Sequence, residues 1–250
     1  MITLLLDADI LIYKNAVRNE QDHDFVKVVD YDKAVVDLKD EIESLKGLLN
    51  ADEVIVCMSC RSRRYWRHDI YPSYKSSRKG GPRPELLFPL KDFVTANYRT
   101  YERPNLEADD IMGILATHPT AVKGKKVIVS TDKDMLTIPG SVYRGGEFPV
   151  EVTPWHADYN HAFQTLMGDS CDGYPGCPRI GRKRAADILE PVLKGDCEGL
   201  WDAVEQAFAV KGKDREFFLT QARLARICRA EDYDFKERKV KLWNPILCRV

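Results

Sequence analysis

The stretch Val127-Ile128-Val129-Ser130-Thr131-Asp132-Lys133-Asp134 joins a short apolar run to two aspartates. An apolar run of this length is typical of a strand that is buried on both faces of a sheet. The same pattern opens the chain, where a strand predicted over Ile2–Leu6 leads directly to Asp7. A third buried strand is predicted over Val54–Met58. The sequence therefore predicts parallel strands, two of which end in acids.

Helices are predicted between these strands, in the order that an α/β sheet requires. Tyr31–Asn50 carries apolar residues at three-four spacing, and further helices are expected near Glu85–Ala96 and Leu106–Ala116. A short strand is expected at Tyr98–Tyr101. The alternation predicts an α/β fold with a mostly parallel central sheet flanked by helices.

Acidic residues form three short clusters in the middle of the chain. Carboxylates a few ångströms apart repel each other by about 4 kcal/mol per pair at an effective dielectric constant of about 20, so they need cations. Oxygen ligands from separate segments suit hard divalent cations, and we expect two magnesium ions beyond the carboxyl ends of the strands. The clusters are Glu107-Ala108-Asp109-Asp110, Asp132-Lys133-Asp134, and Asp169 with Asp172.

The composition limits the class of protein. With 250 residues and 44% apolar content, the chain can form one large domain or a domain with a smaller one. Its apolar runs are far shorter than the roughly 20 residues that span a bilayer, so we expect a cytoplasmic protein without a membrane partner. The odd number of cysteines, 7, predicts free thiols. Cys57 and Cys60 have zinc-ligand spacing, but Cys171 and Cys177 make a poor second pair, which favours packing roles.

Positive charge and aromatic rings are interleaved between Arg61 and Arg83, where Asp69 is the single acid. This composition is typical of segments that bind phosphates and bases, and a solvated loop is the alternative. The residues are Arg61, Arg63, Arg64, Arg67, Lys75, Arg78, Lys79 and Arg83, with Tyr65, Trp66, Tyr71 and Tyr74.

The pattern becomes helical from Trp155 onward, which predicts a boundary near residue 154. A loop rich in glycine and proline over residues 168–181 separates the first two of these helices. It ends in Ile180-Gly181-Arg182-Lys183, which places backbone amides and basic side chains at a helix start, where a phosphate can bind. An ordinary turn is the alternative. The predicted helices are Trp155–Met167, Arg182–Leu189, Glu198–Val210 and Asp214–Ala230.

Taken in order, these motifs resemble the 5′-nuclease superfamily of flap endonucleases and 5′→3′ exonucleases, and most closely the 5′→3′ exonucleases of T-odd bacteriophages. The resemblance covers nearly the whole chain. The motifs are Leu6-Asp7, Tyr74-Lys75-x-x-Arg78, Glu107-Ala108-Asp109-Asp110, Ser130-Thr131-Asp132-Lys133-Asp134 and Gly168-Asp169-x-x-Asp172-Gly173.

The resemblance implies a PIN-like nuclease domain over residues 1–154, with a basic arch at 60–84, and a helical DNA-binding subdomain over 155–250. The latter would hold a helix–three-turn–helix at about 163–190. It further implies hydrolysis of duplex DNA from a 5′ end or flap, in phage DNA replication or degradation, with two Mg²⁺ for which Mn²⁺ can substitute. A monomer is expected, and activity on an RNA strand in an RNA/DNA hybrid is left open.

The resemblance also implies roles for individual residues. The first metal would be held by Asp7, Glu107 and Asp109, and the second by Asp132, Asp134, Asp169 and Asp172, with Asp110 serving either. Lys75 and Arg78 would neutralise charge on the scissile phosphate, and Tyr74 would stack on the terminal base. Further DNA contacts are expected from Lys79, Gly176, Gly181, Arg182 and Lys183.

One position departs from the family pattern, because Ser59 stands where an acid is usual. Asp9 is the nearest substitute in sequence, and we expect a first site completed by water, with weaker Mg²⁺ affinity and a preference for Mn²⁺. Two other functions remain open. Asp7-Ala8-Asp9 has the form found in haloacid-dehalogenase-like phosphatases, although Ile10 does not fit that motif, and Ser59 is compatible with a DNA-end-binding protein of weakened chemistry.

Overall fold

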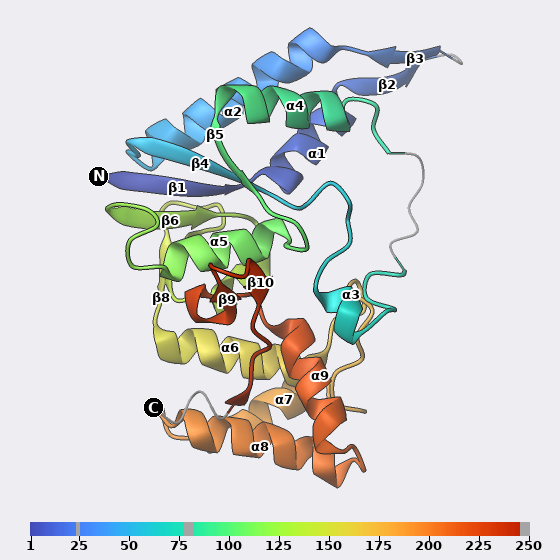
Figure 1. Cartoon of the computed structure of the whole chain (residues 1–250), viewed down its shortest axis with the longest axis vertical. Helices are drawn as coiled ribbons and strands as arrows, with labels where there is room; N and C mark the ends of the chain where they lie inside the picture. The colour runs from blue at the N-terminus through green and yellow to red at the C-terminus, as the bar shows by residue number, and fades with distance from the viewer. Residues whose placement is uncertain (24–25, 78–82, 246–250) are drawn as a thin grey trace.

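A six-stranded sheet forms the centre of the molecule, in the order β5-β4-β1-β6-β7-β8 (Figure 1). The structure is a computed structural model that describes residues 1–23, 26–77 and 83–245. Neighbouring strands are parallel except β7 and β8, which confirms the predicted α/β class. The strands are β1 Ile2–Asp7, β4 Glu53–Met58, β5 Arg99–Glu102, β6 Lys125–Val129, β7 Gly140–Tyr143 and β8 Val150–Val152.

Both faces of this sheet are covered, as the apolar strands require. Leu4 and Leu6 pack in the core on one face, Leu5 packs in the core on the other, and all three are fully buried. The first face is covered by α1 Ala8–Arg18, α2 Tyr31–Leu48 and α4 Leu87–Asn97, and the second by α5 Ala108–Thr117.

The structure adds elements that the sequence patterns did not predict. Helix α1 begins directly after Asp7, whose carboxylate caps it by accepting from the Ile10 amide at 3.4 Å. Because Ile10 and Tyr13 are exposed, its apolar periodicity is blurred. The other additions are the sheet strands β7 and β8, the hairpins β2 Glu20–His23 with β3 Val26–Val29 and β9 Tyr233–Asp234 with β10 Lys239–Val240, the short helix α3 Arg67–Ile70, and the 3₁₀ turns η1 Lys133–Thr137 and η2 Ala230–Asp232.

Four helices form a second layer beside the sheet, with an aromatic core that contains Trp201, Phe208 and Phe218 (Figure 1). They are α6 Pro154–Met167, α7 Arg182–Leu189, α8 Cys197–Val210 and α9 Arg215–Ala225. Helix α9 ends earlier than the predicted Ala230. The prediction was wrong there because the apolar residues that continue its pattern, Ile227 and Cys228, are buried in the core formed by the sheet and α5 instead. None of the described helices is both long and apolar enough to cross a bilayer.

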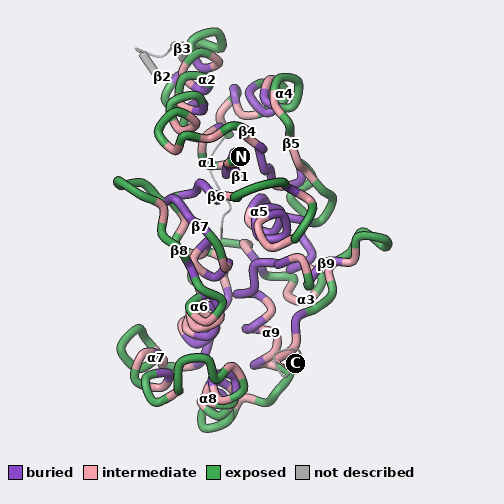
Figure 2. The backbone as a smooth tube through the Cα atoms, turned by 90° about the vertical axis from the view of Figure 1, so that its left-hand side faces the viewer, coloured by how far each residue is buried: buried purple, intermediate pink, exposed green. Residues whose placement is uncertain are grey.

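Residues 226–232, which we call the C-terminal segment, lie against α5. Helix α5 is therefore enclosed by the sheet and by this segment, and most of its residues are buried (Figure 2). The approach is close at Gly113, where an added Cβ would lie 2.3 Å from the Cys228 carbonyl oxygen. Only glycine fits between the two segments.

This contact predicts an unusual response to a glycine-to-alanine change. In an exposed helix, alanine is more stable than glycine by about 0.5–1 kcal/mol, but overpacking costs about 1–3 kcal/mol. We expect Gly113→Ala to lower the free energy of unfolding in urea. Gly47→Ala in α2, where a Cβ meets no described residue within 4 Å, should raise it. Equal gains at both positions would show that the C-terminal segment does not pack on α5 in this way.

Candidate metal and nucleic-acid site

A cleft of about 920 Å³ opens at the carboxyl edge of the sheet and contains most of the predicted acids. It collects side chains from strand ends, a helix start and a distant loop. Lys75, Ser59 and Asp9 also line it. The predicted metal ligands on its wall are Asp7, Glu107, Asp109, Asp132, Asp134, Asp169 and Asp172.

Ser130 connects the acids that follow β1 and β6. Its hydroxyl donates to Asp7 Oδ2 at 2.8 Å and accepts from the Asp132 amide at 3.1 Å. Asp132 in turn caps η1 by accepting from the Asp134 amide at 2.9 Å. Two adjacent parallel strands therefore present three carboxylates from one rigid edge.

Asp134 points toward the helical layer. Its Oδ2 accepts from Gln164 Nε2 of α6 at 2.8 Å, while its Oδ1 is buried without a hydrogen-bond partner among the described residues. Asp169 folds the loop after α6 by accepting from the Cys171 amide at 2.7 Å. An orphaned buried carboxylate oxygen is costly, and it is the kind of atom that a cation satisfies.

Burial and mutual repulsion disturb the ionisation of these acids. Burial, with repulsion from Asp9 and Asp132, raises the pKa of Asp7 to about 6 against the hydrogen bond from Ser130. Burial, with repulsion from Asp132, also raises the pKa of Asp134 to about 6. Burial raises the pKa of Asp109 well above its usual value. The raised pKa values show that the positive charge around these acids does not balance their negative charge. Divalent cations bound to their oxygens would supply that balance, so the carboxylates fit a metal site.

No three His, Cys, Asp or Glu side chains within the described ranges already surround one point closely enough to hold an ion. The carboxylate of Glu107 is instead paired with two positively charged side chains. Lys75 Nζ contacts its Oε1, and Arg67 Nη1 donates to its Oε2 at 2.8 Å. Lys75 Nζ also lies 3.7 Å from Asp172 Oδ1, which puts a positive charge between acids of two different segments.

The basic segment is less open than the sequence suggested. Tyr74 is only 3% exposed, and its hydroxyl lies 3.0 Å from Glu107 Oε2 and 2.9 Å from Asp172 Oδ2. Its ring is therefore not available for a base, in contrast to the stacking role expected for it. Arg78 and Lys79 lie outside the described residues.

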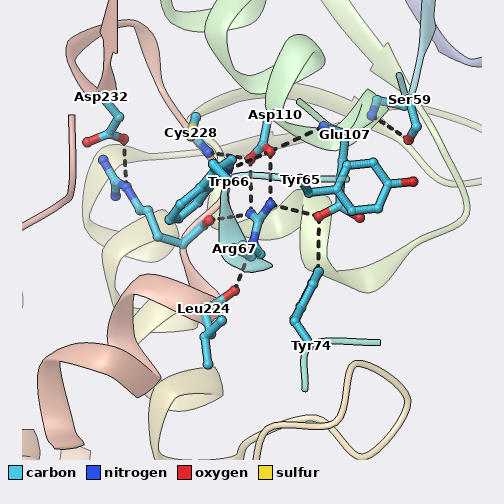
Figure 3. A network of polar contacts seen from close by, with 12 residues as sticks. Ser59, Tyr65, Trp66, Arg67, Tyr74, Glu107, Asp110, Leu224, Cys228 and Asp232 are labelled. Atoms are coloured by element: carbon cyan, nitrogen blue, oxygen red, sulfur yellow. Dashed lines mark hydrogen bonds and ion pairs between the residues drawn. The ribbon is translucent and has the colours of Figure 1, made fainter. Parts of the chain in front are cut away.

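Asp110 also differs from its expected role, because it does not line the cleft. It is fully buried, and its carboxylate accepts from Arg67, from Trp66 Nε1 at 3.0 Å and from the Cys228 amide at 3.1 Å (Figure 3). Burial opposes its ionisation, but Arg67 lowers the pKa of Asp110 below its usual value. The spacing of Glu107 and Asp110 is that of a capping box, a pattern that could have shown Asp110 turning back onto α5.

Ser59 has a structural partner of its own. Its hydroxyl accepts from the Ala108 amide at 2.9 Å, and its amide donates to Asp9 Oδ2 at 3.0 Å. Asp9 thus reaches the cleft although α1 has already begun. Lys91 Nζ, which sequence analysis did not single out, pairs with Asp9 Oδ1 at 2.7 Å. Its place inside an amphipathic helix is more typical of a solvated lysine.

The loop between α6 and α7 has the geometry of a tight backbone turn. Gly176 has φ +63°, and an added Cβ would lie 2.3 Å from the Gly168 nitrogen. The Gly176 amide donates to Gln221 Oε1 of α9 at 2.9 Å, which anchors the loop. Gly181 is the N-cap of α7 and provides no side-chain cap, and Arg182 and Lys183 beside it are exposed. The helix start can accept an anion.

The charge of Asp134 should destabilise the metal-free protein. Its carboxyl has a pKa of about 6 when folded and about 3.9 when unfolded. The cost is therefore present above pH 6 and absent below pH 4. We expect Asp134→Asn to raise the free energy of unfolding by about 1–2 kcal/mol at pH 8 in EDTA, and not at pH 3.5. The exposed Asp202→Asn serves as control. A pH-independent effect would mean that the buried charge is not its cause.

Comparison with known proteins is consistent with this site. A family model described as "5'-3' exonuclease, N-terminal resolvase-like domain" matches residues 3–144. The exonuclease of Escherichia phage T7 is 30% identical in an alignment that covers 97% of this chain and 93% of the phage protein.

Two solved structures from phage T5 share the fold. T5 5′-exonuclease with divalent zinc ions has a TM-score of 0.67 and 18% identity, covering 90% of this chain and 89% of that one. A T5 flap endonuclease pseudo-enzyme–product complex with DNA and metal ions has a TM-score of 0.60 and 16% identity, covering 90% of this chain and 99% of that one. Because the family model spans more than half of the chain, the protein belongs to the 5′-3′ exonuclease family.

Proposed function

We propose that the cleft holds two divalent cations and hydrolyses phosphodiester bonds of duplex DNA at a 5′ end or flap. As a family member the chain is a hydrolase of the 5′→3′ exonuclease and flap endonuclease type that acts on DNA. The observation that carries the proposal is the convergence of eight carboxylates from separate segments on one cleft, seven of them predicted metal ligands. The phosphatase alternative is discarded, because the chain belongs to another family.

The proposed ligands fall into two groups by position. Asp7, Glu107 and Asp109 form the first, and Asp132, Asp134, Asp169 and Asp172 the second. The all-oxygen donors suit Mg²⁺, with Mn²⁺ as a substitute. Bound cations would supply an activated water and stabilise the entering and leaving oxygens. Asp110 is left out, since Arg67 and backbone amides already use its oxygens.

Ser59 supports a first site that is completed by water. Its hydroxyl already accepts from the start of α5, and the neighbouring Asp9 is paired with Lys91. Neither side chain brings an unpaired charge to the position of the missing acid. A preference for Mn²⁺ in the first site stays a prediction on these grounds.

The basic side chains would act on the substrate phosphate. Lys75 lies on the cleft wall between Glu107 and Asp172, from which its ammonium group can stabilise charge that develops on the scissile phosphate. Arg78 is proposed for the same role by its place in the motif.

The turn between α6 and α7 is the proposed grip on the duplex. Gly181 is exposed and leaves the start of α7 open to a phosphate, and Arg182 and Lys183 add exposed positive charge beside the α7 amides. Gly176, also expected to contact DNA, is buried, and its amide donates to Gln221, so it shapes the loop instead. Such contacts read no bases, so binding should depend on DNA structure rather than on sequence. A labelled RNA strand in an RNA/DNA hybrid tests the wider substrate range.

Removing one metal ligand should separate catalysis from binding. Asp109→Ala is expected to abolish release of nucleotides from a labelled 5′ end in Mg²⁺, because the cation site is lost. Affinity for the same DNA in EDTA should be kept or improved, since less negative charge faces the phosphates. Asp202→Ala on α8 should change neither. Parallel loss of cleavage and binding in folded Asp109→Ala would point to a structural role.

If the turn between α6 and α7 contacts DNA phosphates, the salt dependence of DNA affinity should change when its charges are removed. A double Arg182→Gln, Lys183→Gln variant should bind duplex DNA more weakly whatever its sequence. Its plot of log affinity against log salt should flatten by up to about 0.9 for each phosphate that the variant no longer neutralises. A double Lys39→Gln, Lys123→Gln variant, which removes two exposed positive charges elsewhere, is the charge-matched comparison. An unchanged slope would remove this turn from the DNA interface.

A further inference from the structure

The guanidinium of Arg67 is buried beneath the cleft and uses every donor it has. Arg67 is 3% exposed. Its Nε donates to the Leu224 carbonyl at 3.2 Å, and Nη2 donates to the Arg226 carbonyl at 2.6 Å and Asp110 Oδ1 at 2.9 Å. Its Nη1 donates to Glu107 Oε2 and Asp110 Oδ2, both at 2.8 Å (Figure 3). An arginine has five such donors, so none is left over.

These contacts join segments that are far apart in the sequence. Arg67 begins α3, Glu107 is the N-cap of α5, and Leu224 and Arg226 lie at the end of α9 and the start of the C-terminal segment. The Cys228 amide adds a further bond to Asp110. The side chain of Arg67 therefore contacts both a cleft acid, Glu107, and the backbone carbonyls at the end of α9.

The planar fork makes this arrangement directional. Two parallel hydrogen bonds to Asp110 fix the plane of the guanidinium, and the bonds to the Leu224 and Arg226 carbonyls fix its position in that plane. The remaining donor then sets where Glu107 Oε2 can lie. A lysine would keep the charge but could not hold all of these directions at once.

We propose that Arg67 is a positioning residue, which orients Glu107 for cation binding and makes that orientation depend on the docking of residues 224–228. The inference rests on the proposed metal-dependent function. Arg67 acts through Glu107 and touches neither the cleft space nor the substrate. Mutation of a residue that orients a metal ligand typically weakens metal affinity by about 10–100-fold.

The first test measures cation binding without DNA. Arg67→Lys should weaken Mn²⁺ binding by calorimetry about tenfold or more, although the charge is conserved. Val204→Ala, in the separate core of α8, removes buried volume far from the cleft and should leave Mn²⁺ affinity unchanged. Wild-type affinity in folded Arg67→Lys would overturn the inference.

A double variant shows whether the effect passes through Glu107. Glu107→Gln should weaken Mn²⁺ binding, and adding Arg67→Lys should weaken it no further, because the oriented group is already gone. Fully additive losses would overturn the inference. If wild-type protein binds no divalent cation and Glu107→Gln has no effect, the proposed function fails as well.

A measurement on the wild-type protein covers the case in which Arg67 variants do not fold. Coupling is reciprocal, so cation binding at Glu107 should strengthen the bonds of Arg67 and slow hydrogen exchange at the Cys228 amide. Exchange at Val204 should not respond. Unchanged exchange at Cys228 under saturating Mn²⁺ would contradict the proposed link.

Discussion

Repulsion between carboxylates that a parallel sheet forces together governs the rest of this structure. The ends of β1 and β6 are adjacent, so Asp7 and Asp132 cannot move apart without breaking the register of the sheet. Two basic side chains at this edge are consequently paired with acids, Lys75 with Glu107 and Lys91 with Asp9. Burial and the surplus of negative charge together raise the pKa of Asp7 and Asp134 to about 6, which prepares the cleft for cations.

The features that could be predicted from sequence are those with a local cause. A short apolar run followed by an acid, as at Leu6-Asp7 and Val129 with Asp132, reports both a buried strand and the edge at which it ends. Three-four spacing located α2, and glycine and proline located the loop before α7. These local patterns were enough to place the cleft acids, and the order of the motifs indicated the family.

The features that could not be predicted arise from contacts distant in sequence. Arg67 stands among exposed basic residues, and nothing beside it reports that Asp110 and the carbonyls of Leu224 and Arg226 will enclose it. Tyr74 was misassigned for the same reason, because an aromatic residue in a basic segment is equally suited to stacking on DNA or to packing. The early end of α9 depends on the fit of Cys228 against Gly113, which helix periodicity cannot report.

The packing of the C-terminal segment on α5 depends on residues that are synthesised after the whole central sheet. Every strand of the central sheet leaves the ribosome before Leu224–Cys228 does. Until then Asp110 lacks the Cys228 amide and Arg67 lacks its two carbonyl partners, so the interior of the nuclease contains unpaired polar groups. The hydrogen-bond network that holds Glu107 can therefore close only after residues 224–228 have been synthesised.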